Sequence, residues 1–586
     1  DRPGFIANRL GVYWLQCGVV EAFDLGLSVE EADAVIGRPM GIPKTGVFGL
    51  LDLVGLDLMP HVNASMAGAL PAGDSFHALN RDLPLVRRMI AEGCTGRKGK
   101  GGFYRLNTQG GTKVKEAMDL VSGQYRPQRK AELESVSAGG KDLKALLIHA
   151  DKGGRYAWRV LSRTLAYAVA LVPEVADDII AIDEAMRLGY NWKFGPFELI
   201  DQLGPTWFAE RLKAEGMAVP PLLDLAAGRS FYRVEAGRRQ YLGTDGVYRD
   251  EPRPEGVLLL SDVKLRSRPL ARNSSASLWD IGDGVVCLEF HTKMNTLDHD
   301  SLAMAGKAIE VVRTGFKALV IYNEGNQFSA GANISLALFA ANLAAWTEIE
   351  KLVALGQETY RALKYAPFPV IGAPSGLALG GGCEILLHCD SVQAHAETYI
   401  GLVETGAGLV PAWGGCKEML VRWAAHPKAP HGPMPPVVNV FETVAVATVA
   451  RSAAEARDHL FLRDSDGITM NRARLLADAK ARALALVEAY RPPTPPALSL
   501  PGASGRAALG MVVEGFRAQG KATPHDVVVA AELAGVLSGG AADPTEETDE
   551  ISLLALERAA FMRLVRHPAT LARIEHMLDT GKPLRN

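Results

Sequence analysis

Apolar residues recur at helical spacing in the first part of the chain. Residues 3–26 carry them through about six turns, which predicts a helix with one buried face. Glu21 and Asp24 interrupt this segment, and no run of about 18 apolar residues occurs anywhere in the sequence. A membrane-spanning helix is therefore not expected.

Short apolar runs dominate a later region. Residues 284–290, 318–322 and 370–371 have the length and composition of buried strands. A helix is predicted after the three glycines at 380–382, because Ile385, Leu386 and Leu387 follow them directly. The glycine run therefore lies between a predicted strand and a predicted helix.

The helical part contains an internal repeat at a fixed offset of 149 residues. Because a domain of about 100 residues leaves much apolar surface exposed, we expect the two copies to pack face to face about a local two-fold axis. Five positions match: Gly46 and Gly195, Phe48 and Phe197, Leu50 and Leu199, Asp52 and Asp201, and Gly55 and Gly204.

Composition narrows the classes of protein. A chain of 586 residues is expected to form about two to four domains. Lys and Arg number 63 against 66 Asp and Glu, a net charge of −3, so no nucleic-acid partner or anionic membrane surface is expected. Six cysteines without a framework spacing predict reduced thiols and a cytoplasmic location. Because the chain opens at Asp1 on a turn, we expect a fragment of a longer protein.

Glu384 is the strongest candidate for chemistry. The glycines before it let backbone N–H groups approach a ligand, and the start of the helix suits an oxyanion. An acid in the first turn of a helix most often only complements the helix dipole or faces water. The apolar neighbours Cys383 and Ile385 argue against simple solvent exposure and favour a catalytic role.

Cys383, His388 and Cys389 offer a metal-site interpretation. On a helix these positions, five and six residues apart, do not share one face. We therefore expect no metal site and interpret the three residues as small apolar thiols and a core histidine.

Two motifs around Glu384 resemble one known family. F-S-A-G-A at 328–332 is followed by G-L-A-L-G-G-G-C-E at 376–384. This order resembles the crotonase (enoyl-CoA hydratase/isomerase) superfamily. The resemblance implies an oxyanion hole from the backbone N–H groups of Ala332 and Gly381. It also implies two catalytic acids, Glu384 and Glu404, a CoA-ester substrate, and no cofactor for hydration.

A weaker part of the same resemblance concerns CoA. Lys293 and Asn295 stand where the family shows an N-x-L turn beside CoA. Lys293 could meet a CoA phosphate, and it could equally be a solvated loop lysine.

The first part of the chain resembles another family. P-G-F-I-A-N-R at 3–9 and G-C-T-G-R-K-G-K-G-G-F-Y at 93–104 are similar to the C-terminal domain of 3-hydroxyacyl-CoA dehydrogenases. In that family a Rossmann domain that binds NAD precedes this region, and no G-x-G-x-x-G unit of that kind lies in this sequence. Asn8 matches the family's active-site asparagine, and it could equally be a polar residue beside a helix.

Together these patterns predict a multidomain protein. We expect two all-α dehydrogenase C-terminal-type domains (1–106 and 152–245), linkers at 107–151 and 246–275, and an α/β crotonase domain with C-terminal helices at 276–586. The predicted function is enoyl-CoA hydratase within a bifunctional β-oxidation enzyme whose intact form also oxidises 3-hydroxyacyl-CoA with NAD. The alternatives are a crotonase-family isomerase or hydrolase and a non-catalytic docking module. Homo-oligomers are possible.

Overall fold

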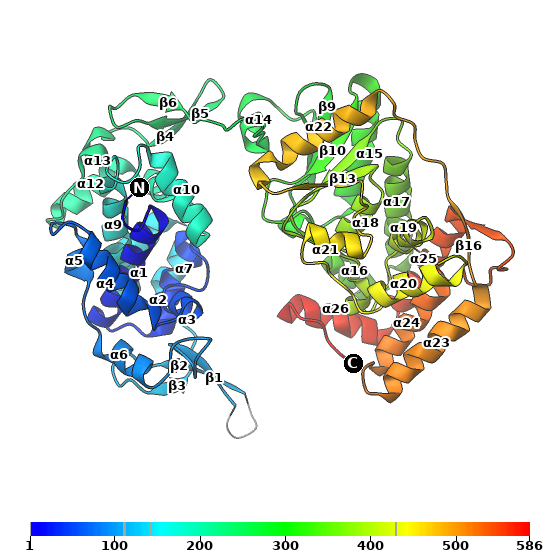
Figure 1. Ribbon diagram of the computed structural model, residues 1–586, viewed down its shortest axis with the longest axis horizontal. Helices are drawn as coiled ribbons and strands as arrows, with labels where there is room; N and C mark the ends of the chain where they lie inside the picture. The colour runs from blue at the N-terminus through cyan, green and yellow to red at the C-terminus, as the bar shows by residue number, and fades with distance from the viewer. Residues whose placement is uncertain (1, 109–112, 141, 428–429) are drawn as a thin grey trace. The chain divides into compact units, whose positions relative to one another are not determined.

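The computed structural model describes residues 2–108, 113–140, 142–427 and 430–586 (Figure 1). The chain divides into two compact units, Asp1–Pro252 and Arg253–Asn586, each with its own hydrophobic core. Among the helices of the described ranges, none is both long enough and apolar enough to cross a membrane. Residues 109–112 and 141 of the first predicted linker lie outside the described residues.

The first copy of the repeat consists of helices followed by a small antiparallel sheet. Helix α1 confirms the helix predicted over residues 3–26, and its side chains Trp14 and Cys17 are buried. The elements are α1 (Ala7–Asp24), α2 (Val29–Val35), η1 (Arg38–Met40), α3 (Phe48–Val54), α4 (Leu58–Ala69), α5 (Phe76–Leu79), α6 (Pro84–Ala91), β1 (Tyr104–Asn107), β2 (Val114–Met118) and β3 (Tyr125–Pro127).

The second copy repeats this order. Asp151 and Asp178 cap its first two helices by accepting hydrogen bonds from the N–H groups of Gly154 and Ala181. The elements are α9 (Lys152–Ala170), α10 (Ile179–Tyr190), α11 (Pro196–Leu203), α12 (Pro205–Ala214), α13 (Pro221–Leu225), β4 (Tyr232–Glu235), β5 (Arg238–Leu242) and β6 (Tyr248–Asp250).

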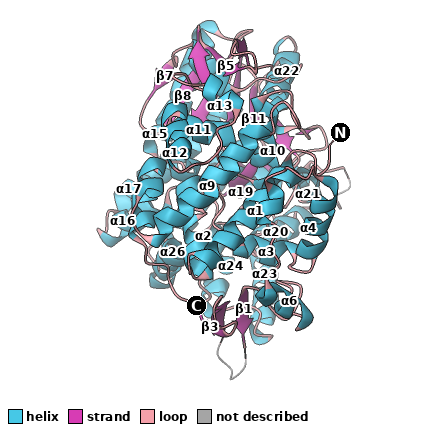
Figure 2. Ribbon diagram, turned by 90° about the vertical axis from the view of Figure 1, so that its left-hand side faces the viewer, coloured by secondary structure: helices cyan, strands magenta, loops and turns pink. Residues whose placement is uncertain are grey.

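The two copies share one core. Helices α1 and α9 pack side by side (Figure 2). The Tyr13 and Tyr167 rings stack with centroids 4.0 Å apart, and the Tyr156 hydroxyl donates to the Gly18 carbonyl at 2.8 Å. The predicted direct contact between the copies is confirmed, whereas the two-fold axis stays a prediction.

In the first copy, two buried aspartates tie the helices to the sheet. Asp33 accepts hydrogen bonds from the N–H groups of Phe48 (2.8 Å) and Gly49 (3.0 Å) and from the Tyr104 hydroxyl (2.9 Å). Asp52 accepts from the N–H groups of Phe103 (2.7 Å) and Tyr104 (2.8 Å). Each carboxylate thus satisfies backbone donors at a helix start or a strand start.

The second copy reproduces these bonds. Asp183 accepts from the N–H of Phe197 (2.8 Å) and from the Tyr232 hydroxyl (3.0 Å). Asp201 accepts from the N–H groups of Phe231 (2.6 Å) and Tyr232 (2.8 Å). We call the four side chains that make these bonds the frame acids: Asp33, Asp52, Asp183 and Asp201.

Two expectations for this unit need correction. The domains are not all-α, because Y-R-L-N and Y-R-V-E after the helices form the first strand of a three-stranded sheet in each copy, held at its start by a frame acid. The segment 107–151 is not a bare linker, since its described part contains β2, β3, α7 (Glu134–Gly139) and α8 (Leu143–Ile148). The segment 246–275 likewise contains β6, α14 (Leu260–Arg266) and β7.

The second unit is built on a seven-stranded sheet in the order β15-β13-β11-β10-β9-β8-β7. The strands from β9 to β15 pair in parallel, and β7 and β8 are antiparallel additions. The predicted strands at 284–290, 318–322 and 370–371 are confirmed. The bounds are β7 (Ala271–Arg272), β8 (Ala276–Asp280), β9 (Val285–Phe290), β10 (Ala318–Tyr322), β11 (Val370–Ala373), β13 (Ser391–His395) and β15 (Gly467–Thr469).

Alternate residues of these strands serve two cores. Leu319 and Ile321 of β10 face the larger core with α15, whereas Val320 and Tyr322 face α22 on the other side. Smaller sheets are the parallel pair β12 (Gly376–Leu379) and β14 (Thr398–Gly401) and the antiparallel pair β16 (Ala497–Ser499) and β17 (Glu547–Asp549).

The helices of this unit include a C-terminal group, which was expected. The bounds are η2 (Lys293–Asn295), α15 (His299–Gly315), α16 (Ile334–Asn342), α17 (Trp346–Lys364), α18 (Gly381–Leu387), η3 (Glu404–Ala407), α19 (Gly415–Ala424), α20 (Met434–Val444), α21 (Ala453–Asp458), η4 (Arg472–Arg474), α22 (Leu475–Val487), α23 (Gly502–Ala518), α24 (Pro524–Leu537), α25 (Glu550–Leu564) and α26 (Pro568–Thr580).

Candidate active site

The glycine run forms the junction between β12 and α18. Gly380 has a φ of 53°, and a Cβ added there would lie 3.1 Å from Glu404 Oε1. A Cβ added to Gly381 would lie 2.6 Å from the Trp413 ring. Glycine is therefore needed at both positions, because the backbone of the junction lies directly against side chains of the site.

Two backbone N–H groups meet at this junction. A Cβ built on Gly381 would lie 3.4 Å from the nitrogen of Ala332, so the two loops are in close contact. Leu379 N donates to Ser329 O at 3.0 Å and joins them. Neither the Ala332 N–H nor the Gly381 N–H has an acceptor within the described part of the chain. Two donors therefore stay available to a ligand.

Tyr360 of α17 holds the Gly381 peptide from behind. Its hydroxyl donates to the Gly381 carbonyl at 2.8 Å. Its ring packs edge to face on Trp413, with centroids 5.5 Å apart. The carbonyl of Gly381, next to its free N–H, is thus fixed by a buried side chain that the sequence patterns did not single out.

Glu384 is buried and engaged by one of its oxygens. Its Oε1 accepts hydrogen bonds from the N–H groups of Trp413 (2.8 Å) and Gly415 (2.9 Å). Burial raises the pKa of Glu384 to about 7, and these two bonds oppose the rise by stabilising the carboxylate. Near neutral pH the side chain can therefore exist with or without its proton.

Glu404 has the opposite environment. It opens η3, and its Oε2 is buried without a hydrogen-bond partner among the described residues. Burial, followed by the nearby charge of Glu384, raises the pKa of Glu404 well above its usual range. The structure thus brings the two predicted acids together, one favouring its charged form more than the other. Such a pair can share one proton and act as base and acid.

A third acid behind the site was missed by the sequence reasoning. Glu557 of α25 is buried and accepts hydrogen bonds from the N–H groups of Gly414 and Lys417, each at 2.8 Å. Burial and then the charge of Glu384 raise the pKa of Glu557 to about 8. Its position on the apolar face of α25, four residues after Leu553, is the signal that could have found it.

Lys293 and Asn295 lie on η2. Asn295 uses its amide to donate to the Gln327 carbonyl at 3.0 Å, and its own carbonyl accepts from the Ser329 hydroxyl at 2.7 Å. These bonds fasten η2 to the loop that ends at Ala332. Lys293 is exposed and makes no ion pair with another described residue. The structure therefore gives Asn295 a positioning task and leaves Lys293 accessible.

Asn8 lies in the first turn of α1, in the other unit, and its side chain is exposed. Nothing in its surroundings distinguishes the active-site role from the alternative of a polar residue beside a helix start.

His388 and its neighbouring cysteines are core residues. The His388 Nδ1 lies 2.7 Å from the Glu384 carbonyl, and burial, together with the Lys417 charge, lowers the pKa of this histidine to about 3. Cys383 and Cys389 are buried free thiols. Within the described ranges, no group of three or more His, Cys, Asp or Glu side chains could hold a metal ion.

Comparison with known families agrees with this division of the chain. A model of the enoyl-CoA hydratase/isomerase family matches residues 280–431, which include both acids and the glycine run. A model of the 3-hydroxyacyl-CoA dehydrogenase C-terminal domain matches residues 4–106 and 154–227, which are the two copies of the repeat. Both expected resemblances are therefore confirmed.

Individual relatives show the same combination. A probable 3-hydroxyacyl-CoA dehydrogenase of Bacillus subtilis is 38% identical over 595 residues, which cover 100% of this chain and 74% of that protein. A putative fatty acid oxidation complex trifunctional enzyme of Rickettsia felis is 34% identical over 72% of this chain, and the match spans 55% of that relative. A crotonyl-CoA hydratase of Syntrophomonas wolfei is 36% identical over 22% of this chain and 48% of its own length.

Proposed function

Because the chain belongs to the 3-hydroxyacyl-CoA dehydrogenase family and contains an enoyl-CoA hydratase/isomerase domain, we propose that its second unit adds water to trans-2-enoyl-CoA. The product is 3-hydroxyacyl-CoA, formed by syn addition. The observation that supports this assignment is the pair of buried acids, Glu384 and Glu404, beside two backbone N–H groups that have no acceptor.

The N–H groups of Ala332 and Gly381 receive the thioester carbonyl. As water adds, negative charge accumulates on that carbonyl oxygen, and two fixed donors stabilise it without reorganising. Removing one such donor typically costs about 10²–10³ in rate. The Tyr360 hydroxyl supports this arrangement, because it holds the carbonyl of Gly381, the residue whose N–H is one of the two donors.

Glu384 acts as the base and Glu404 as the acid. The Glu384 carboxylate is stabilised by two backbone donors, so it takes a proton from water while the oxygen attacks C3. Glu404, which has no such stabilisation at Oε2, keeps its proton more readily and delivers it to C2. Water is thereby added across the C2–C3 double bond, and the two acids exchange their protonation states.

The CoA part of the substrate is proposed to pass η2. Lys293 is the exposed cation there, and it can meet a phosphate group. Asn295 acts through the backbone, since its side chain fastens η2 to the loop before Ala332.

The dehydrogenase reaction of the whole protein is a separate proposal. The described sheets of the first unit are antiparallel and three-stranded, and they do not fit the parallel strand–turn–helix unit that binds a dinucleotide. NAD therefore has no place in the mechanism proposed for this chain. We propose that Asn8 contributes to 3-hydroxyacyl-CoA oxidation only together with such a domain.

Hydration of crotonyl-CoA tests the assignment. Loss of the enoyl-thioester absorbance should be measured for the native chain and for Glu384→Gln and Glu404→Gln. Each substitution is expected to reduce turnover by about a hundredfold or more, because general acid/base catalysis contributes about 10²–10⁴. Binding of the CoA ester should change little. Unchanged turnover in either variant would contradict the assignment, and a shifted double bond or free CoA as product would favour the isomerase or hydrolase alternative.

A further inference from the structure

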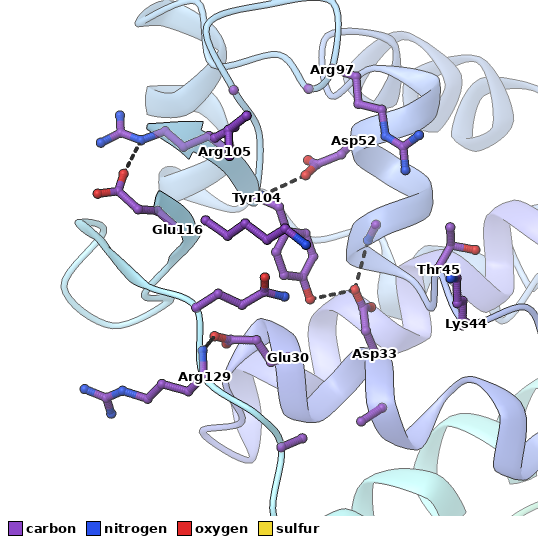
Figure 3. A pocket seen from close by; sticks show the side chains of 18 of the residues that line it. Glu30, Asp33, Lys44, Thr45, Asp52, Arg97, Tyr104, Arg105, Glu116 and Arg129 are labelled. Atoms are coloured by element: carbon purple, nitrogen blue, oxygen red, sulfur yellow. Dashed lines mark hydrogen bonds and ion pairs between the residues drawn. The ribbon is translucent and has the colours of Figure 1, made fainter. Parts of the chain in front are cut away.

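A cavity of about 1040 Å³ opens in the first copy of the repeat (Figure 3). It is far more than a gap between helices, because several separate segments line it. These are α2, the loop before α3 with the first turns of α3 itself, the glycine-rich loop at 96–101, strands β1 and β2, and the stretch 128–131 after β3. The glycine-rich loop is the G-C-T-G-R-K-G-K-G-G-F-Y segment, which has no part in the proposed hydration.

The acids of this cavity are already engaged. Asp33 and Asp52 are frame acids, held by backbone N–H groups as their counterparts in the second copy are. Glu30 forms a bidentate pair with Arg126, at 2.7 and 2.8 Å, outside the lining of the cavity. Glu116 pairs with Arg105 at 2.6 Å. These carboxylates are therefore explained by the fold itself.

The cations of the cavity are not engaged in the same way. Five of them line it without an acidic partner in the described part of the chain: Lys44, Lys100, Lys115, Arg129 and Lys130. A sixth, Arg97, lies close enough to Asp52 for its charge to lower the pKa of that carboxyl. Among their side chains, only Lys100 makes a hydrogen bond there, to the Glu92 carbonyl at 3.2 Å. The excess charge surrounds one space, where it attracts an anion.

In the second copy, the cation at the matching position is neutralised by acidic side chains. Strand pairing makes Lys115 the counterpart of Arg239, because the register matches Asn107 with Val114 and Glu235 with Arg238. Arg239 pairs with Glu198 at 2.6 Å and with Glu251 at 3.1 Å. The counterpart of Glu198 at the repeat offset is Gly49, so Lys115 lacks the acid that Arg239 has.

The glycine-rich loop of the first copy also carries more positive charge than the matching loop of the second copy. Counted back from the matched Phe103 and Phe231, Arg97 and Lys100 correspond to Leu225 and Gly228. No steric need explains Gly49, since a Cβ there would make only ordinary contacts, the nearest 3.5 Å from Asp33 Oδ2. The first copy thus keeps the frame acids, adds cations and lacks both acids that pair with Arg239, since Gly49 and Gln128 stand in place of Glu198 and Glu251. This is the pattern of a binding site.

We propose that this cavity binds a nucleotide with two or more phosphate groups. Lys44, Arg97 and Lys115 reach the phosphates from three different segments, and phosphate oxygens form strong charge-assisted hydrogen bonds with such groups. Tyr104 and Leu106 add apolar surface for a base. The size of the cavity suits a ligand of this class. Both a free nucleotide and the nucleotide end of CoA have this chemistry.

Calorimetric titration of the 586-residue chain tests this site. ADP, CoA and inorganic pyrophosphate are the probes, at low and at high salt. We expect ADP or CoA to bind, and binding to weaken as salt screens the cations. Gly49→Glu, which copies Glu198, and Lys115→Gln are each expected to weaken binding by about tenfold or more. Gly49→Gln is the matched neutral control, and Lys193→Gln is the control in the second copy; both should bind like the native chain.

The probes separate the two sources of the ligand. Equal binding of ADP and CoA identifies a free nucleotide, and binding of CoA alone identifies its nucleotide end. Because the second unit is also proposed to bind CoA, the variants should remove one of two CoA binding events. Crotonyl-CoA hydration should be unchanged in all four variants, so this test is independent of the proposed function. Binding of pyrophosphate alone, no binding at all, or native affinity in Gly49→Glu and Lys115→Gln would overturn the proposal.

Discussion

Buried carboxylates in the two units of this protein differ in how completely their oxygens are hydrogen-bonded. In the first unit each frame acid accepts two or more hydrogen bonds, mostly from backbone N–H groups. In the second unit Glu384 accepts two backbone N–H bonds through one oxygen, and burial raises its pKa to about 7. Glu404 differs, because one of its buried oxygens has no hydrogen-bond partner among the described residues. A satisfied buried acid stabilises a fold, whereas an unsatisfied one beside a second acid is free to exchange a proton.

Loss of a frame acid is expected to have the largest effect on the free energy of unfolding, and it tests whether these acids are structural. Asp52→Ala leaves the N–H groups of Phe103 and Tyr104 buried without an acceptor, which is expected to cost about 2–4 kcal/mol of unfolding free energy. Asp201→Ala is the matched change in the second copy and should cost a similar amount. Urea denaturation measures both. Crotonyl-CoA hydration should stay native in the folded variants, and a loss of turnover there would contradict the separation of roles.

The pH dependence of hydration tests the protonation states assigned to the two catalytic acids. The pKa of Glu384 is raised to about 7, and the base must be ionised, so kcat/KM should fall about tenfold per pH unit below that value. The pKa of Glu404 is also raised well above its usual range, and this acid must keep its proton, so the rate should fall again at the pH where Glu404 loses it. The profile of kcat/KM on crotonyl-CoA checks this. A flat profile from pH 5 to 9 would argue against both roles.

The frame acids should affect stability, and the sign can be worked out. Burial raises the pKa of Asp33 to about 7 and that of Asp183 to about 8, far above the value of an unfolded aspartate. Between about pH 4 and these values the folded state binds more protons than the unfolded state, so stability falls as pH rises. Each group contributes a slope of at most about 1.4 kcal/mol per pH unit.

Asp183→Asn provides the measurement for that slope. Because asparagine does not titrate, the difference in unfolding free energy between this variant and the native chain should change with pH between about 5 and 8 and level off above. Asp33→Asn should behave alike, with its limit nearer pH 7. A difference that is independent of pH would show that these carboxylates do not titrate in this range.

The smallest effect concerns Glu404. Because Glu404 keeps its proton and its Oε2 has no hydrogen-bond partner among the described residues, Glu404→Gln exchanges one neutral side chain for another and removes no satisfied contact, so stability should change by less than about 1 kcal/mol. Urea denaturation of the same variant that is used for catalysis measures this. A loss of several kcal/mol would place Glu404 among the structural acids.

Inside the first unit, the two copies of the repeat share their buried contacts and differ in their charged residues. Both retain the frame acids and the aromatic pairs Phe48–Phe103 and Phe197–Phe231, whose ring centroids lie 4.6 and 4.8 Å apart. In the first copy, Lys44 and Lys115 line a cavity and have no acidic partner among the described residues, whereas Arg239, the counterpart of Lys115 in the second copy, pairs with Glu198. Core contacts constrain a side chain from several directions at once, whereas an exposed lysine can change without disturbing the frame.

Sequence patterns alone identified the long first helix, the 149-residue repeat and the strand–glycine–helix junction at Gly380. They also pointed to Glu384, and resemblance added Glu404, Ala332 and Gly381. These features are local, because periodicity, glycine runs and motif spacing depend on residues that are close together in the sequence. The same local reasoning missed the small sheets, since F-Y-R-L is too short to predict a strand without the Asp52 bonds that hold it.

Tertiary structure decided what depends on distant segments meeting. Glu557 lies 173 residues after Glu384, yet both accept hydrogen bonds from the same turn, at Gly414 and Gly415. The unpaired oxygen of Glu404 and the paired ones of Asp33 cannot be distinguished by residue type, because partners and burial set them apart. The free charge of Lys115 likewise follows from a glycine 66 positions earlier in the chain. A sequence names the ionisable groups, and only the fold determines which of them have partners.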